Sequence, residues 1–445
     1  MRLLFILPEY LPHSGGGIVT FYRHLLPEIV RQDHQVHVLV GSAFTSKLPS
    51  YEADGITVEF LDTDAVSANV DKFNRYHATP ELQRHLAAAW TAWEQVDRGK
   101  NYDLVETTDW GLLFAPWVLE AGTPPTVVQL HGSVGQIDFY DPQCGNELQG
   151  SLIRFLEREL LSVADGLITH SQLNVKAWSL LTGREVTYIP PAWSPVSNLD
   201  LAEEKSSHGL AVGRIQYWKG PIVLCEALRL LGDSSPIIDW LGRDTAYQEL
   251  GASMSAYLAQ TYPDVWGVKI RPLGLRSPEE TAKLQAAADF IVVPSIWDIF
   301  NYTCVEGMGC AQVVLCSQGA GAASLIDSEV NGLTFPANAP AALAESIRYF
   351  QGMSPDSRRQ MGTLAQQTVR NTLDPKSVVK QRLETYEKLI QQGKSPVRPD
   401  DWLVNATCPQ KPLTQALAFL DSLPLKELSR YILHRSFKKF FRYSL

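Results

Sequence analysis

The stretch Pro190-Pro191-Ala192-Trp193-Ser194-Pro195, with the polar residues 198–208 after it, separates two halves of the chain that share one pattern. Proline fixes φ and removes a hydrogen-bond donor, so this stretch predicts a linker. On each side of it, short apolar runs alternate with longer segments of helical periodicity. Repeated strand–helix–strand units of this kind predict parallel sheets covered by helices on both faces. The sequence therefore predicts two α/β domains.

The expected strands are short and almost entirely apolar. Before the linker they are Leu3–Leu7, Val36–Val40, Ile56–Phe60, Leu104–Glu106, Val127–Leu130, Gly166–Thr169 and Thr187–Ile189. After it they are Gly209–Val212, Ile237–Trp240, Ile270–Pro272, Phe290–Val293, Val313–Leu315 and Leu333–Phe335. In open α/β sheets ligands bind outside the carboxyl ends of the strands, so functional motifs are expected directly after strands.

Composition and charge narrow the class of protein. The chain has 445 residues, 45% hydrophobic and 20% charged, as expected of two or three globular domains. Its net charge of −9 argues against a nucleic-acid partner. The six cysteines show no C-x-x-C spacing, which argues against a zinc site. The apolar start is too short for a signal peptide and no run is long enough to span a membrane, so we expect a cytoplasmic protein.

The first motif is Ser14-Gly15-Gly16-Gly17-Ile18, between the first strand and a helix. Glycines allow positive φ and a close approach of the backbone to a ligand. The N–H groups at the start of the helix would face a phosphate or a carboxylate. A flexible turn without a ligand is an equally good interpretation of this motif alone.

The second motif follows the first strand of the second half, where Gly213-Arg214 is followed by Lys219-Gly220. Arginine presents a fork suited to phosphate, and lysine adds a mobile point charge. Together they would neutralise a diphosphate as it leaves a sugar. Two solvated surface cations are the alternative.

The third motif, Pro294 to Met308, holds two acidic residues eight positions apart, Asp298 and Glu306. Ionised carboxylates accept hydrogen bonds, and sugar and ribose hydroxyls are suitable donors. However, Thr303-x-x-Glu306 has the spacing of a helix capping box. On pattern alone the capping box is the favoured interpretation.

Taken together, these motifs resemble the retaining glycosyltransferases of family 4, which have the GT-B fold of two Rossmann-like domains facing a central cleft. The resemblance covers residues 1–390, and the family's Glu-x7-Glu signature falls on Asp298 and Glu306. The other matching segments are Gly15-Gly16-Gly17, Gly213-Arg214 with Lys219-Gly220, the strand Thr126–Gly132 with His131 near its end, and Val186–Pro190.

The resemblance implies a donor site for a nucleotide-diphosphate sugar, with no metal and no other cofactor. Glu306 would hold the ribose, Arg214 and Lys219 the diphosphate, and Gly16 and Gly17 would lie beside the phosphates. No carboxylate is assigned as a nucleophile, so retention would proceed by displacement on one face of the sugar.

Two further residues would act at the donor sugar itself. His131 and Asp298 are the catalytic candidates: His131 would lie near the sugar, and Asp298 would meet its hydroxyls. Without the resemblance, a core histidine at a strand end would be the favoured interpretation of His131.

The resemblance also implies the domain boundaries. We expect an acceptor domain over residues 1–192, a nucleotide-sugar domain over 205–375, and a helix over 376–395 that returns to the first domain. A basic amphipathic extension over 396–445 would follow.

Several residues depart from the family pattern. Asp298 replaces a glutamate and is one methylene shorter, and Asn301 stands where glycine is usual. In the loops that follow, Ala-x-Gly-x-Pro is replaced by a segment containing Ala311, and the usual glutamate is absent near Ser324. These changes are expected to cluster around the donor site, where they would indicate an unusual donor sugar or weakened catalysis.

Two other functions stay open at this point. A catalytically inactive homologue that binds a sugar or a partner is favoured by the changes at Asp298 and Ser324. Retention of Arg214, Lys219 and Glu306 opposes it. A sugar epimerase or phosphorylase of the same architecture is the second, although the pyridoxal-phosphate lysine signature of a phosphorylase is absent.

The C-terminal residues 426–445 combine aromatic and basic side chains. Leu433, Phe437, Phe440 and Phe441 recur at helical spacing beside Lys438 and other basic residues. This pattern is typical of an interfacial helix, and a lipid-linked acceptor would give it a purpose at the inner face of the membrane. A helix that packs back on the first domain is the alternative.

Overall fold

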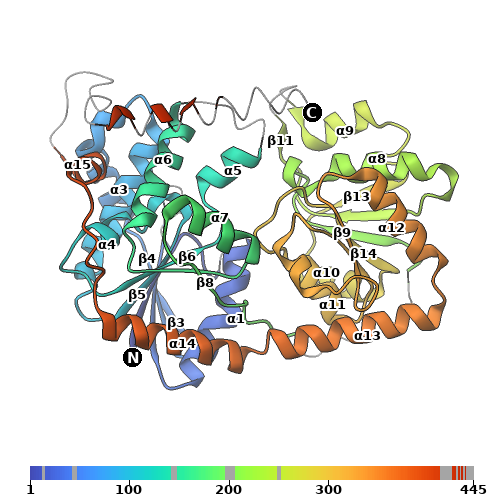
Figure 1. The fold of residues 1–445 in the computed structure, drawn as a ribbon, viewed down its shortest axis with the longest axis horizontal. Helices are drawn as coiled ribbons and strands as arrows, with labels where there is room; N and C mark the ends of the chain where they lie inside the picture. Colours follow the sequence, from blue (N-terminus) through green and yellow to red (C-terminus); the bar gives the residue numbers. More distant parts are fainter. Residues whose placement is uncertain are drawn as a thin grey trace. The chain divides into compact units, whose positions relative to one another are not determined.

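The computed structural model describes residues 1–12, 16–42, 48–141, 148–195, 206–247 and 252–410, with 423–426, 429, 430, 432, 433 and 436. The chain forms two compact units. Unit 1 comprises Met1–Thr169, Asn174–Ile189 and the chain from Val378 onward, and unit 2 comprises His170–Leu173 and Pro190–Ser377. Each unit is a mainly parallel sheet with helices on both faces, which confirms the predicted fold class (Figure 1).

The sheet of unit 1 has the strand order β3-β4-β2-β1-β5-β6-β7-β8, and only the β3–β4 pair is antiparallel. Its strands are β1 (Arg2–Leu7), β2 (Gln35–Val40), β3 (Tyr51–Ala53), β4 (Ile56–Phe60), β5 (Leu104–Thr108), β6 (Thr126–Leu130), β7 (Gly166–Thr169) and β8 (Thr187–Tyr188). Every residue of β5 and β6 is buried, as expected of central strands covered on both faces.

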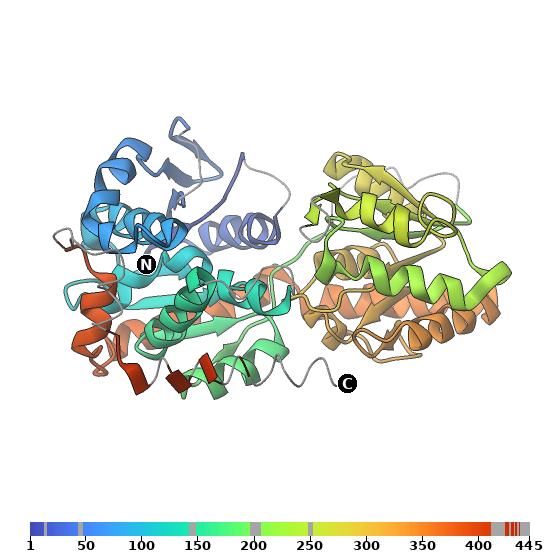
Figure 2. The ribbon, with the colours of Figure 1, turned by 90° about the horizontal axis from the view of Figure 1, so that it is seen from above.

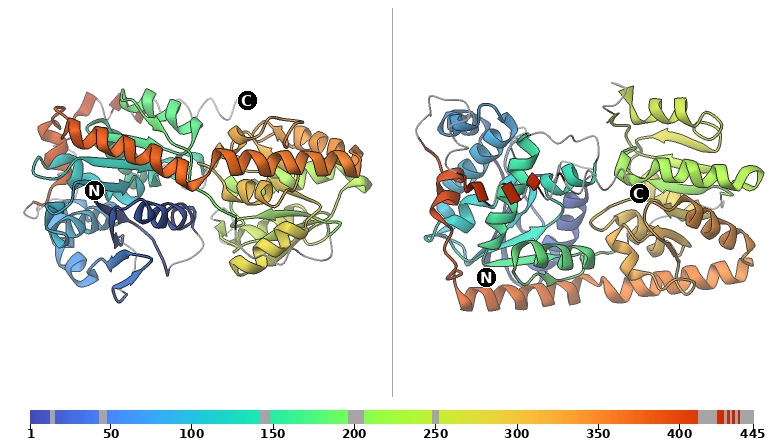
Figure 3. Two further views of the ribbon diagram at one scale, coloured as in Figure 1. Left: turned by 90° about the horizontal axis from the view of Figure 1, so that it is seen from below. Right: turned by 45° about the horizontal axis from the view of Figure 1, so that its top comes forward.

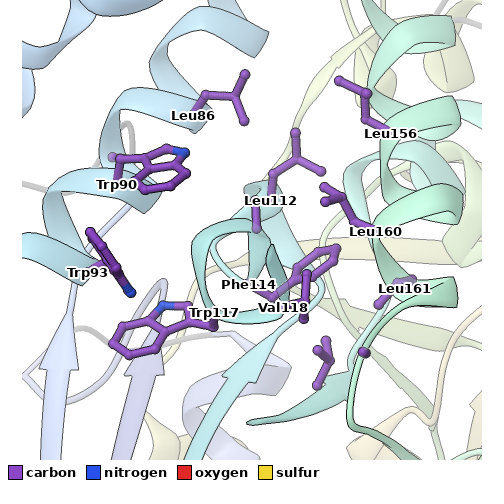
Figure 4. Close-up of a cluster of buried hydrophobic side chains, with 14 of the residues drawn as sticks. Leu86, Trp90, Trp93, Leu112, Phe114, Trp117, Val118, Leu156, Leu160 and Leu161 are labelled. Carbon is purple, nitrogen blue, oxygen red and sulfur yellow. The ribbon is translucent and has the colours of Figure 1, made fainter. Parts of the chain in front are cut away.

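The helices of unit 1 fall on the two faces of this sheet. They are α1 (Gly17–Arg31), α2 (Thr63–Val70), α3 (Pro80–Gln95), α4 (Ala115–Leu119), α5 (Val134–Tyr140), α6 (Leu148–Ser162), α7 (Gln172–Thr182), α14 (Pro375–Gln392) and α15 (Asp401–Thr407). On one face, Trp90 and Trp93 of α3 pack toward Trp117 of α4, and leucines of α6 lie on the other side of α4 (Figure 4). On the other face, α14 lies across the sheet (Figure 3, left).

A buried ion pair joins α14 to the centre of the sheet. Glu106 of β5 and Arg382 of α14 are both 0% exposed, and their closest charged atoms are 3.0 Å apart. Tyr22 of α1 also donates to Glu106 at 2.8 Å, and Tyr386 and Gln129 complete the network. A charge buried this deeply is tolerated only when it is paired and hydrogen-bonded.

The short helix α15 was not expected, because residues 396–445 were predicted as an extension. Leu403 and Ala406 join the core of unit 1, and Trp402 stacks on Phe155 of α6. The carbonyl groups at the end of α15 accept hydrogen bonds from Arg75, Tyr76 and Trp90. Among the described residues, no helix has both the length and the apolar composition needed to cross a membrane.

Unit 2 is a second doubly wound sheet, with the strand order β13-β10-β9-β14-β15-β16. Its strands are β9 (Gly209–Val212), β10 (Ile238–Leu241), β13 (Ile270–Gly274), β14 (Phe290–Val293), β15 (Val314–Ser317) and β16 (Leu333–Phe335), and a small hairpin adds β11 (Ala246–Tyr247) and β12 (Ala252–Ser253). Its helices are α8 (Pro221–Leu231), α9 (Met254–Thr261), α10 (Pro278–Ala287), α11 (Tyr302–Gly309), α12 (Pro340–Gly352) and α13 (Pro355–Thr372) (Figure 2).

The segment predicted as a linker begins unit 2 and is partly built into its core. Trp193 is 6% exposed and packs in the cluster that contains Met308 and Leu373. Its backbone N–H donates to the carbonyl of Leu373 at 2.9 Å. The prolines do prevent regular structure, but the apolar residues between them still pack against the unit that follows.

Candidate functional site

The strand order of unit 2 marks where a ligand would bind. The chain order reverses between β9 and β14, and ligands of doubly wound sheets bind outside the carboxyl ends of the strands at such a point. Lys219 follows β9 and Asp298 follows β14. Their side chains meet there, with Lys219 Nζ 2.5 Å from Asp298 Oδ2. Both are partly accessible, with side-chain exposures of 20% and 16%.

Backbone contacts hold these two residues together. The single 3₁₀ turn η4 (Tyr217–Lys219) is joined to the Asp298 loop because Trp218 O accepts from Ile296 N at 2.8 Å. Gly220 follows with a φ of +76°, and a Cβ there would lie 1.9 Å from the Pro294 carbonyl oxygen. Glycine is therefore required after Lys219 by both conformation and space.

The loop after β15 supports Asp298 from its other side. Asp298 N donates to Gly319 O at 2.9 Å, and Gly321 N donates to Asp298 O at 3.1 Å. A Cβ on Gly321 would lie 2.0 Å from the Ile299 carbonyl oxygen, so only glycine allows this approach. Ser324, at the place of the missing glutamate, donates its hydroxyl to Gly321 O within the same loop.

The capping box that spacing alone favoured at Thr303 and Glu306 does not form. Helix α11 begins at Tyr302, so Thr303 already lies inside it, and its hydroxyl donates to Val212 O at 3.1 Å. That bond ties α11 to the end of β9. Glu306 accepts instead from Gln285 of α10, with Nε2 2.8 Å from Oε2. Glu306 therefore does not cap the N-terminus of α11.

Arg214 lies at the end of β9 and is exposed. Trp240 Nε1 of β10 donates to Gly213 O at 2.8 Å and so holds the turn that carries Arg214. The second motif thus places two cations, Arg214 and Lys219, after the same strand.

Ala311 does not lie near Lys219 and Asp298, contrary to expectation. It precedes β15, whereas the site residues follow their strands, so it lies at the opposite edge of the sheet. Gln312 donates to Ala286 O at 2.6 Å and Gln366 to Gly309 O at 2.7 Å, which packs this segment against α10 and α13. Ala311 keeps the left-handed φ of +55°, which explains why the family usually has glycine there.

In unit 1, Gly16 and Gly17 lie at the start of α1, and Gly15 lies outside the described residues. Gly16 has a φ of −104°, so positive φ is not the reason for glycine here. A Cβ on Gly16 would lie 1.8 Å from a carboxylate oxygen of Glu9. The start of α1 thus has a carboxylate beside it, in agreement with the positive end of the helix dipole.

His131 lies directly after β6, with its ring against α1. The ring centroid is 4.8 Å from that of Phe21 and 5.4 Å from that of Tyr22. Asp109, which follows β5, was not among the residues predicted from the sequence. Its carboxylate accepts from His131 N at 2.8 Å and Gly132 N at 3.2 Å, and it is 0% exposed. Its position directly after a buried strand was the available signal.

A second buried carboxylate supports the same loop. Glu157 of α6 is 1% exposed and accepts from Gly135 N at 3.2 and 3.3 Å. Desolvation by burial raises the pKa of Glu157 to about 8 and that of Asp109 to about 7, although hydrogen bonds oppose both shifts. The His131 loop therefore rests on two carboxyl groups that titrate near neutral pH.

These raised values predict how stability depends on pH. A carboxyl whose pKa is higher in the folded chain stabilises the fold at low pH, and this contribution is lost as the pH rises through the folded value. We expect the melting temperature to fall between about pH 4.5 and about pH 8, the window set by the shift of Glu157. In Glu157→Gln, which keeps an acceptor for Gly135, the fall should be smaller. An equal fall in both proteins, measured by calorimetry, would contradict this assignment.

Family comparisons cover most of the chain. Residues 16–190 match the family described as "Glycosyl transferase 4-like domain", and residues 200–368 match "Glycosyl transferases group 1". The chain is 26% identical to a D-inositol 3-phosphate glycosyltransferase of Xylanimonas cellulosilytica, over 75% of this chain and 83% of that protein. It is 26% identical to the protein of the same name from Corynebacterium jeikeium, over 56% of this chain and 64% of that protein.

Solved structures share the fold at low sequence identity. Sucrose-phosphate synthase from Thermosynechococcus elongatus has a TM-score of 0.67 and 18% identity, covering 88% of this chain and 100% of that chain. HepE from Anabaena, solved with UDP and glucose, has a TM-score of 0.60 and 20% identity, covering 87% and 100%. The chain therefore belongs to glycosyltransferase family 4 and has the GT-B fold.

Proposed function

We propose that this chain is a retaining glycosyltransferase that moves a sugar from a nucleotide-diphosphate sugar to a glycan or lipid-linked acceptor without a metal ion. The observation that carries the proposal is the pairing of Lys219 with Asp298 at the switch point of unit 2, after the same strand that carries Arg214. HepE, which shares the fold, was solved with UDP-glucose, which supports a nucleotide sugar as donor.

Each nucleotide group has residues suited to it. Lys219 has three N–H donors and uses one on Asp298, so others remain for the diphosphate together with the guanidinium of Arg214. Gln285 orients the carboxylate of Glu306, which would accept from the ribose hydroxyls. Gly16 and Gly17 would lie beside the phosphates at the start of α1.

The proposed reaction is a displacement on one face of the sugar. The bond from C1 to the diphosphate oxygen breaks, the acceptor oxygen bonds to C1, and the acceptor proton passes to the departing phosphate. Arg214 and Lys219 stabilise the charge that develops on the leaving group. Asp298 would accept hydrogen bonds from the sugar hydroxyls, and His131 would lie near the sugar. No side chain bonds to C1 in this single displacement, so no covalent intermediate forms.

A donor panel tests this function directly. Wild-type protein is incubated with UDP-, GDP- and ADP-sugars, and both sugar release and nucleotide binding are measured. We expect slow release from one donor. If no nucleotide sugar and no free nucleotide binds at millimolar concentration, the inactive homologue, which the missing glutamate near Ser324 favours, becomes the better account.

A lipid-linked acceptor would place the enzyme at the inner face of the membrane, in contact through residues 426–445. Most of these residues lie outside the described part of the chain, but Ile432 and Leu433 are 45% and 68% exposed, and Leu425 just before them is 72% exposed. Deleting Leu425–Leu445 should reduce sedimentation with anionic vesicles without lowering the melting temperature, since the buried Leu423 remains. Sedimentation equal to that of the full chain would contradict the membrane contact.

A further inference from the structure

Asn301 has a backbone conformation that favours glycine. It precedes α11 with a φ of +78° and a ψ of 92°. Side chains other than glycine rarely adopt such a φ, although asparagine tolerates it better than most. Glycine would relieve the conformation at no cost in contacts if the side chain had no role. The side chain of Asn301 therefore needs an explanation of its own.

The orientation of the Asn301 amide follows from its neighbours. Nδ2 lies 2.9 Å from Asp298 Oδ2 and 3.4 Å from Ser295 Oγ. A carboxylate only accepts hydrogen bonds, so the amide nitrogen must be the atom that faces Asp298. The amide oxygen Oδ1 therefore points away from Asp298.

That oxygen is buried and has no hydrogen-bond partner among the described residues. Asn301 as a whole is only 9% exposed. A buried polar atom without a partner is costly, and native proteins rarely keep one without a functional reason. Oδ1 is therefore suited to accept a hydrogen bond from a ligand.

Asp298 presents a second acceptor beside it. Its Oδ2 is already occupied by Lys219 Nζ at 2.5 Å and by Asn301 Nδ2 at 2.9 Å. Its Oδ1 takes no hydrogen bond from any residue that the structure describes. Asp298 and Asn301 thus form one hydrogen-bonded pair with an open acceptor on each side chain, next to the ammonium group of Lys219.

We infer that Asn301 is a specificity-determining residue that accepts a hydrogen bond from one hydroxyl of the donor sugar, while Asp298 accepts from a neighbouring hydroxyl. The inference rests on the proposed donor site. Aspartate is one methylene shorter than glutamate, and the amide of Asn301 supplies an additional acceptor where a glycine would supply none. The preferred donor is therefore a sugar with two adjacent free hydroxyls facing this pair.

The test follows the logic of a double-mutant cycle: the side chain of Asn301 and single hydroxyls of the sugar are removed separately and together. Wild type and Asn301→Gly are compared with the nucleotide sugar that wild type prefers and with its monodeoxy analogues, and kcat and KM are measured for each. Glycine suits the positive φ, so this variant should fold. Ala311→Gly is the matched control, because it also places glycine at a positive φ but lies at the opposite edge of the sheet.

We expect Asn301→Gly to lower kcat/KM for the preferred sugar by about tenfold or more, and to remove the loss that wild type shows with one particular deoxy analogue. Inhibition by the free nucleotide diphosphate should not change. If the variant keeps the wild-type deoxy profile, this inference is overturned while the proposed function stands. If wild type neither binds nor consumes any nucleotide sugar, the proposed function fails and the inference fails with it.

Discussion

Lys219→Ala is expected to lower the rate of sugar transfer by about 100- to 1,000-fold, the effect typical of removing one group that stabilises charge in a transition state. The ammonium group lies 2.5 Å from Asp298 at the switch point of unit 2, where a departing diphosphate would gain negative charge. Affinity for the free nucleotide diphosphate should fall as well, because the same cation would contact it before and after transfer. Steady-state kinetics and calorimetric titration with the nucleotide measure the two effects.

Lys394 provides the matched control. It is 23% exposed and pairs with Asp165 at 3.0 Å in unit 1, so Lys394→Ala also removes a partly buried lysine from an ion pair. We expect this variant to keep the donor kinetics of wild type. A kcat/KM for Lys219→Ala within about threefold of wild type would show that the leaving group is stabilised elsewhere.

The second large effect is on stability. Glu106→Gln is expected to destabilise unit 1 by about 3–5 kcal/mol, because it leaves the fully buried guanidinium of Arg382 without a compensating charge. The melting temperature of that unit should fall by about 10 °C or more. Thermal unfolding followed by calorimetry measures this, since the two units need not melt together.

Two further variants separate this cause from a general loss of packing. Combining Glu106→Gln with Arg382→Met removes both charges and should recover part of the lost stability, in the manner of a double-mutant cycle. Arg359→Ala removes an arginine whose ion pair with Asp356 is highly exposed, and it should have no measurable effect. If the double variant were as unstable as the sum of the two single variants, the charge argument would be wrong.

The strands illustrate how much of the fold the sequence predicted. Ile56–Phe60, Gly166–Thr169, Gly209–Val212, Phe290–Val293 and Leu333–Phe335 were predicted with the boundaries that the structure has. Central parallel strands are buried on both faces, so they stand out as continuous apolar runs. The short strand Tyr51–Ala53 was missed because it is mostly exposed and has no such run.

The site was predicted less completely, and the reason lies in the kind of contact involved. Lys219, Asp298 and Glu306 were candidates from the sequence, and the structure pairs the first two. Spacing alone favoured a capping box for Glu306, because a local pattern cannot reveal that Gln285 lies opposite on another helix. Asp109 was missed for the same reason, since its partners His131 and Gly132 follow the neighbouring strand of the sheet.

The sequence by itself determined the two parallel α/β domains, their strands and the order of the motifs, because periodicity and burial are written along the chain. Only the tertiary structure decided which of those residues meet. It placed Lys219 with Asp298, because strand order determines which loops after the strands are neighbours. The tertiary structure also shows that Asn301 Nδ2 donates to Asp298, while Asn301 Oδ1 has no hydrogen-bond partner among the described residues. These contacts cannot be predicted from the spacing of residues along the chain.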